Sequence, residues 1–448
     1  MKYRADIDGL RAVAVVSVVI YHLNETFLSG GFVGVDIFFV ISGYLITKLI
    51  VSELSTTHTF SFKNFYLRRV RRLFPALFFT FLFSLLLAYK IFSPQHLANF
   101  GESVVYATTS LSNFLFWSQS SYFDQQNLFK PLLHTWSLSI EEQFYLVWPA
   151  LLFFLFLYAK KRFLPIALLF IGACSLLLNL YFLYNAEEML SMFMPESESS
   201  LDIRSTMFYL LPFRVFEFVI GAIIVWAPSY KNIYRRDEIL FLIGFAAIGY
   251  SLFIFNGETI FPYFNALWPS VGAALIIVSG PNHAFSGLLR NKAMVGIGLI
   301  SYSLYLIHWP IIVFYNYWKS SQLGSVDYLL IAVASTLLAV FMYRFVEQPF
   351  RKSKSAPGQS NKPFLRTSFA LAALLCLVSW NAYSSAGWLW RYPAHVIKQL
   401  DYSRGDYTEF FWREMTQYQG DFARNGKTKV LLVGDSMAAD LLNALSAG

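Results

Sequence analysis

The sequence predicts an all-α polytopic membrane protein, and three observations lead to that class. Hydrophobic residues make up 56% of the 448 residues and charged residues only 14%. The mean hydropathy is +0.49. Apolar stretches of about 20 residues, long enough to cross a bilayer as a helix, recur along most of the chain. Because the backbone groups of such a stretch must be satisfied without water, we expect these stretches to be helices.

Eleven membrane spans are predicted, of which the first ten form one bundle. They cover residues 10–23, 32–50, 74–92, 138–158, 163–184, 207–226, 239–255, 265–279, 293–314, 326–345 and 368–388. Residues 97–117 are also fairly apolar, but Gly101, Glu102 and a cluster of Ser, Thr and Asn interrupt them. We interpret this segment as an outer-surface or re-entrant segment.

The distribution of Lys and Arg predicts the orientation, because these residues concentrate in cytoplasmic loops. With the N-terminus inside, every basic cluster falls in an inner segment, and the outer loops between spans hold only Lys90, Lys130, Arg204 and Lys319. The N-terminus is therefore expected on the cytoplasmic side of the membrane and the C-terminus on the outer side.

Four regions follow from this pattern. Residues 1–350 form the membrane domain, and residues 351–366, which contain Pro357 and Gly358, form a cytoplasmic linker. Residues 367–388 form the eleventh span. Residues 389–448 form an extracytoplasmic linker and the truncated start of a soluble α/β domain, in which a buried strand at 430–433 leads into Gly434-Asp435-Ser436.

The charge and the cysteines exclude two classes of function. The formal net charge is +8, but the basic residues lie mostly in short loops, where they indicate topology and not nucleic-acid binding. Cys174 and Cys376 both lie inside apolar runs and are expected to be buried thiols. No spacing of Cys and His suggests a metal site, so no metal is predicted.

Arg11 and His22 are ionisable residues on the first span. They are eleven residues apart, about three helical turns, so both point to one side with His22 about 16 Å further along the axis. An arginine suits phosphate binding, and a histidine can act as general base or acyl acceptor. Alternatively, Arg11 is a topology anchor and His22 an interfacial polar end.

Two further groups contain charged residues near or within spans. Arg69 and Arg72 share a helix face before the third span, either as a clamp for an anionic cofactor or as an ordinary basic cluster. Glu141 and Glu142 lie near the outer end of the fourth span, where they either face the bundle interior or cap the helix.

Five other residues complete the candidates. Asp36 is a lone carboxylate among aromatic residues and is expected to have a buried partner. Arg214 and Glu217 are three residues apart and are expected to neutralise each other. His134 precedes the fourth span. His308 precedes Trp309-Pro310 and is either a site residue or an interfacial histidine.

In this order the motifs resemble acyltransferase family 3, the integral-membrane acyltransferases of bacterial envelopes. The resemblance covers about residues 3–350. It rests on Asp6-Ile7-Asp8-Gly9-Leu10-Arg11 with Tyr21-His22, the run from Gly34 to Tyr44, Arg69 with Arg72, Trp136-Ser137-Leu138 through Glu141-Glu142 to Tyr145, and the run from Ser301 to Pro310. The segment from Val430 resembles the start of an SGNH hydrolase domain, whose nucleophile corresponds to Ser436, and the fused arrangement looks most like O-antigen acetylases.

The resemblance implies an O-acetyltransferase of the bacterial inner membrane that uses cytoplasmic acetyl-CoA, and it makes the outer side, where the C-terminus is expected, the periplasm. Arg11, Arg69 and Arg72 are then expected to hold the acyl donor, with His22, Glu141, Glu142 and Ser436 in catalytic roles and Asp36, His134 and His308 lining the site. The acceptor is expected to be an envelope glycan, such as the O-antigen of lipopolysaccharide, or a lipid-linked sugar. The main alternative is a transporter of a glycolipid or organic acid without covalent chemistry, and an enzyme with a different acceptor is a third possibility.

Overall fold

A computed structural model describes residues 3–119, 129–158, 163–185, 203–227, 234–319, 322–352 and 361–393. The chain divides into two units, Met1–Gly387 and Trp388–Gly448. In the second unit the described residues end at Pro393 and include one short 3-10 helix, Leu389–Arg391. The predicted SGNH segment, including Ser436, lies outside the described residues.

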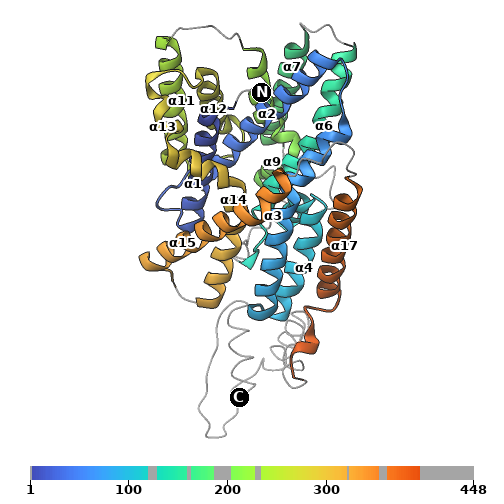
Figure 1. The fold of residues 1–448 in the computed structure, drawn as a ribbon. Coiled ribbons are helices and arrows are strands. Elements are labelled where there is room, and N and C mark those ends of the chain that lie inside the picture. Colours follow the sequence, from blue (N-terminus) through green and yellow to red (C-terminus); the bar gives the residue numbers. More distant parts are fainter. Residues whose placement is uncertain are drawn as a thin grey trace. The chain divides into compact units, whose positions relative to one another are not determined.

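The first unit is helical throughout its described part, as predicted, and contains no β-strand there (Figure 1). Its longer helices are α1 (Ala5–Leu23), α2 (Gly34–Thr57), α3 (Phe62–Ile91), α4 (Pro94–Thr108), α6 (Thr135–Tyr158), α7 (Leu164–Tyr184), α11 (Tyr234–Ile254), α12 (Leu267–Ser279), α14 (Lys292–Lys319), α15 (Ser325–Phe341) and α17 (Lys362–Ser384). Shorter helices are α5 (Ser112–Ser118), α9 (Ile203–Tyr209), α10 (Val215–Ile223), α13 (Gly287–Arg290) and α16 (Gln348–Lys352).

Eight helices among the described residues are long and apolar enough to cross a membrane, so the class of a multi-pass membrane protein is confirmed. They correspond to eight of the eleven predicted spans. They are Gly31–Thr57, Phe62–Ile91, Thr135–Tyr158, Leu164–Tyr184, Arg235–Ile254, Lys292–Lys319, Ser325–Arg351 and Lys362–Ser384.

The other three predicted spans differ from a simple membrane helix. The first, α1, carries Asp6, Asp8 and Arg11 within its 19 residues. The predicted span 207–226 is broken, because α9 ends at Tyr209 and α10 starts only at Val215. The predicted span 265–279 belongs to a pair of helices bent by 111° at a short break. Apolar runs in these places therefore mark broken or polar helices near the centre of the fold.

The ambiguous segment at residues 97–117 forms two helices, α4 and α5, with a break at Thr109–Leu111. Neither belongs to the helices that meet the length and hydropathy of a span. Helix α17 packs along α4 (Figure 1), and a Cβ added at Gly101 would lie 2.4 Å from the carbonyl oxygen of Ser379. The small residue at position 101 thus permits close contact with α17.

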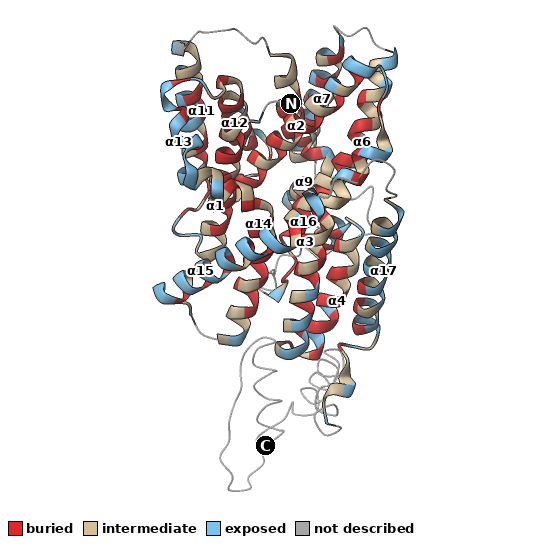
Figure 2. Ribbon diagram, in the orientation of Figure 1, coloured by how far each residue is buried: buried red, intermediate tan, exposed pale blue. Residues whose placement is uncertain are grey.

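Helix α1 lies in the interior, packed against α2 and α14. A Cβ added at Gly298 would lie 1.8 Å from the carbonyl oxygen of Asp8, so only glycine allows α14 to approach this closely. In contrast, α15 exposes Val326, Leu329, Leu330, Val333 and Leu337 (Figure 2). Exposed apolar surface of this kind is expected where a helix faces lipid, while the buried helices α1, α2 and α14 position the polar residues of the site.

Candidate functional site

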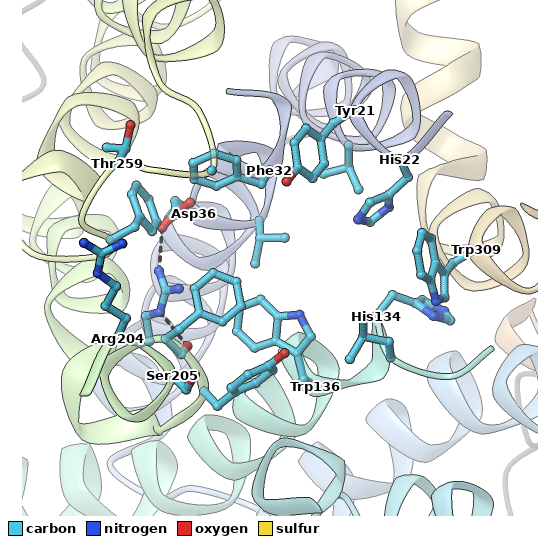
Figure 3. Close-up of a pocket in the computed structure, with 18 of the residues that line it drawn as sticks. Tyr21, His22, Phe32, Asp36, His134, Trp136, Arg204, Ser205, Thr259 and Trp309 are labelled. Carbon is cyan, nitrogen blue, oxygen red and sulfur yellow. Dashed lines mark hydrogen bonds and ion pairs between the residues drawn. The ribbon is translucent and has the colours of Figure 1, made fainter. Parts of the chain in front are cut away.

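A cavity of about 470 Å³, called here the histidine cavity, lies among the described helices. In Figure 3 His22, His134 and Trp309 lie on one side of its open centre, and Asp36 and Arg204 lie on the other. Its lining comes from α1, α2, α6, α9 and α14, together with residues just before α2, α6 and α10 and in the segment between α11 and α12. The lining residues are Val18, Tyr21, His22, Phe32, Val35, Asp36, Leu133, His134, Trp136, Arg204, Ser205, Phe208, Tyr209, Arg214, Asn256, Gly257, Thr259, Phe261 and Trp309.

His22 lies in the last turn of α1 and contacts two residues of α14. Its Nδ1 is 2.9 Å from Nε2 of His308. Its ring centroid is 4.7 Å from that of Trp309. These contacts fix the ring of His22 at the wall of the histidine cavity.

The third histidine of this group, His134, is 2% exposed, and its Nε2 is 3.1 Å from the carbonyl oxygen of Leu306. Pro310 explains why this carbonyl is free to accept. Proline has no N–H, so the carbonyl four residues earlier, at Leu306, loses its helical partner. The sequence His308-Trp309-Pro310 thus creates an acceptor that His134, just before α6, uses.

The opposite wall contains a buried ion cluster. Nη1 of Arg214 is 3.0 Å from Oδ1 of Asp36 and 3.0 Å from Oε1 of Glu217, and all three side chains are at most 1% exposed. The guanidinium also lies 4.9 Å from the ring centroid of Phe208. Asp36 therefore has the buried partner that the sequence predicted, and the predicted Arg214–Glu217 pair is present.

A second cavity of about 50 Å³, called here the arginine cavity, lies among α1, α2, α3, α6 and α14. Arg11, Arg72 and Glu141 line it. The other lining residues are Val35, Phe38, Phe39, Ile41, Ser42, Leu73, Ser137, Leu138, Tyr145, Ser301, Tyr302 and Tyr305. It thus brings together two cations and one carboxylate from three helices.

Glu141 and Glu142 occupy different surroundings. Oε1 of Glu141 accepts hydrogen bonds from the hydroxyls of Ser42 and Tyr145 at the wall of the arginine cavity. Glu142 does not line that cavity and instead borders a void of about 20 Å³ beside Leu73 and Phe74. Because adjacent helical residues point about 100° apart, only Glu141 reaches the arginine cavity.

The three predicted donor-binding arginines also differ in where they lie. Arg11 and Arg72 line the arginine cavity. Arg11 is 3.8 Å from Asp8, and Arg72 forms no ion pair within the part of the chain that the structure describes. Arg69 does not line the cavity; its guanidinium lies over the ring of Tyr145, 5.1 Å from the centroid. Two cations therefore line the arginine cavity, and the guanidinium of Arg69 packs on Tyr145 at its wall.

The two cavities are neighbours, because Val35 lines both. The arginine cavity also contains Ser137 and Tyr305, whose hydroxyl oxygens are 2.5 Å apart. The Tyr305 hydroxyl donates to the carbonyl oxygen of His134, at 3.0 Å, and His134 lines the histidine cavity. These side chains form the partition between the cavities.

Several residues at the site were not predicted individually. Ser42, Tyr145, Tyr305 and Trp309 lie within the motifs that were singled out, but their contacts depend on which helices pack together. Tyr145 had the clearest signal, since it is four residues after Glu141 and therefore on the same helix face. Arg214 was expected only as a structural partner, yet it lines the histidine cavity.

Comparison with known proteins gives consistent matches. The family model described as "Acyltransferase domain" matches residues 4–344. "O-acetyltransferase OatA" of Staphylococcus aureus strain MRSA252 is 34% identical over 390 residues, which cover 84% of this chain and 62% of that protein. A "putative O-acetyltransferase" of strain MSSA476 is 33% identical over 366 residues, which cover 79% of this chain and 58% of that protein. The chain therefore spans about three-fifths of the length of these curated relatives. No solved structure matches it.

The matched residues include every helix that lines either cavity, namely α1, α2, α3, α6, α9 and α14. The match favours an enzyme over the transporter considered above. On this evidence the chain belongs to acyltransferase family 3, the integral-membrane acyltransferases.

Proposed function

We propose that this chain is a membrane O-acetyltransferase that moves an acetyl group from acetyl-CoA to a hydroxyl group of an envelope glycan. The observation that carries the proposal is the arrangement of α1. This helix contributes Arg11 to the arginine cavity and His22 to the histidine cavity. The two residues are about 16 Å apart along the axis.

The chemistry of CoA fits this separation. Its phosphates lie at one end of the molecule and its thioester at the other, with the extended pantetheine arm between them. Arg11 and Arg72 supply the cations that phosphate requires. The thioester then reaches the histidine cavity, provided that the arm passes Val35 and Tyr305.

In the proposed reaction His22 acts as the general base. It takes the proton of the acceptor hydroxyl while the hydroxyl oxygen attacks the thioester carbonyl carbon. The new C–O bond forms, the C–S bond breaks, and the proton passes from His22 to the leaving CoA sulfur. Glu141, held by the hydroxyls of Ser42 and Tyr145, offsets part of the positive charge of the two arginines in the cavity where the donor binds.

The sidedness of the proposal rests on the distribution of Lys and Arg. With Arg11 towards the cytoplasm and His22 towards the outer half of the membrane, the donor enters from the cytoplasm and the acceptor from the periplasm of the inner membrane. The names of the relatives specify O-acetyl transfer and no acceptor. The O-antigen of lipopolysaccharide and a lipid-linked sugar are therefore the acceptors to test first, and transfer through Ser436 remains a separate proposal.

The experiment uses membranes that carry the full chain, supplied with acetyl-CoA labelled in the acetyl group and with envelope glycan. We expect label in alkali-labile ester linkage on the glycan, and none with membranes that lack the chain. Movement of the label across the membrane, with no ester formed on the glycan, would instead support the transporter.

A further inference from the structure

Two histidines from different helices meet at the wall of the histidine cavity. Nδ1 of His22 is 2.9 Å from Nε2 of His308, so one of the two nitrogens carries a hydrogen and the other accepts it. His308 is fully buried, at 0% exposure, in the middle of α14. Which nitrogen carries the hydrogen decides which atom of His22 is free to react.

The backbone around His308 settles this point. Its Nδ1 is 2.8 Å from the carbonyl oxygen of Tyr305 and 3.1 Å from that of Leu304. A carbonyl oxygen only accepts, so Nδ1 of His308 must carry the hydrogen. A buried imidazole whose partners are two carbonyls and another imidazole is neutral, because a buried charge needs a compensating charge. Its Nε2 therefore carries a lone pair.

The tautomer of His308 determines the tautomer of His22. Because Nε2 of His308 accepts, Nδ1 of His22 must donate, and Nε2 of His22 holds the lone pair. This Nε2 has no hydrogen-bond partner among the described residues and is not among the fully buried unpaired atoms, and His22 lines the histidine cavity. The opposite arrangement would turn the lone pair of His308 Nδ1 towards two carbonyl oxygens.

We propose that His308 is a positioning residue, which fixes the tautomer of His22 so that Nε2 is the atom that accepts the substrate proton. The proposal rests on the proposed function, since it assumes that His22 is the base. When Nε2 takes the proton, His22 becomes an imidazolium, and the bond from its Nδ1–H to His308 becomes charge-assisted and stronger. The hydrogen bonds to the two backbone carbonyls keep the ring of His308 from flipping. Its Nε2 therefore stays in position to accept from His22 throughout the reaction.

The test compares two replacements of His308 in the full chain in its membrane. Gln offers a side-chain oxygen that can accept from Nδ1–H of His22, and Leu fills the site without an acceptor. We expect His308→Leu to lower kcat about 100-fold, within the range that a general base contributes, while KM for acetyl-CoA stays constant. His308→Gln should recover most of that loss. His96→Leu serves as the matched control, since His96 packs among Phe92, Phe129 and Tyr317 away from both cavities, and it should keep the original kcat.

A double variant separates positioning from a general structural role. If His308 acts through His22, adding His308→Leu to His22→Ala should change the residual rate no further. A further loss in that background would overturn the proposal. Full activity of His308→Leu together with an inactive His22→Ala would also overturn it and would leave the proposed function intact.

A direct measurement covers the case in which His308→Leu does not fold. The ¹⁵N spectrum of the histidine-labelled wild-type protein, with His22 assigned by comparison with His22→Ala, reports which ring nitrogen is protonated. We expect a protonated Nδ1 and an unprotonated Nε2. A protonated Nε2 in the resting protein would contradict the assignment.

Discussion

Arg11 and His22 lie on the same helix, α1, yet each faces a different cavity. Eleven residues separate them, which places them about 16 Å apart along the helix axis. Val35, on the neighbouring helix α2, borders both cavities. The proposed reaction uses this arrangement, with the charged end of the donor at Arg11 and the reacting end at His22.

Glu141 and Glu142 are predicted to differ in importance. In Glu141→Gln a neutral amide oxygen replaces the charged Oε1 that accepts from both Ser42 and Tyr145, so both hydrogen bonds become weaker. We expect kcat/KM for acetyl transfer to fall about tenfold or more, because a hydrogen bond to a charged group is worth about 1.5–3 kcal/mol and one between neutral groups about 0.5–1.5 kcal/mol. Glu142→Gln should retain activity close to the original. Equal losses in both variants would contradict the distinction.

Arg11 and Arg72 are predicted to bind the donor. Loss of one hydrogen bond to a charged group costs about 1.5–3 kcal/mol, so Arg72→Ala should raise KM for acetyl-CoA roughly tenfold or more, with kcat less affected. Arg68→Ala is the control, because Arg68 is exposed and pairs with Glu53 at 3.8 Å. An unchanged KM for acetyl-CoA in Arg11→Ala and Arg72→Ala would contradict donor binding and leave both arginines with a role in membrane topology only.

Val35 is predicted to control passage between the cavities. In Val35→Phe a ring replaces the small side chain that lines both cavities, so the donor should no longer reach His22. We expect acetyl transfer to fall at least about tenfold while acetyl-CoA still binds, since overpacking costs only about 1–3 kcal/mol of stability. Val333→Phe, at an exposed site on α15, should transfer normally. Normal transfer by a folded Val35→Phe protein would exclude this route.

The cluster of Asp36, Arg214 and Glu217 is predicted to stabilise the fold. Asp36→Asn removes one of the two carboxylates that contact Nη1 of Arg214 among side chains that are at most 1% exposed, and loss of a hydrogen bond between charged groups costs about 1.5–3 kcal/mol. The thermal unfolding temperature in detergent should therefore fall by several degrees. The control Asp237→Asn removes the partner of Arg236 in a partly exposed pair and should cost about 1 kcal/mol or less. Equal shifts in both variants would contradict a structural role for the cluster.

Much of the architecture could be predicted from the sequence, because hydropathy reports directly on segments that face lipid. The eight helices with long apolar runs were all expected. The three remaining positions were harder, because α1 carries charged residues in its first half, a break separates α9 from α10, and a sharp bend follows α12. Hydropathy alone does not separate a continuous span from a broken one.

The site could be predicted only in part. Helical periodicity placed Arg11 and His22 on one face of α1, but it could not show that His308 would meet His22. That contact depends on the close packing of α14 against α1 at Gly298. The same limit applies to Glu141 and Glu142, because their 100° separation was evident but the cavity that one of them faces was not.

The measurement that tests the central claim most directly is acetyl transfer in sealed, inverted membrane vesicles. Labelled acetyl-CoA is supplied only to the exposed cytoplasmic face, and ester-linked label is measured on glycan enclosed in the lumen. The account predicts luminal acetylation by the original chain and a loss of about 100-fold or more in His22→Ala, within the range for removal of a general base. Luminal acetylation that is equal in His22→Ala, or that appears only when acetyl-CoA is placed in the lumen, would contradict it.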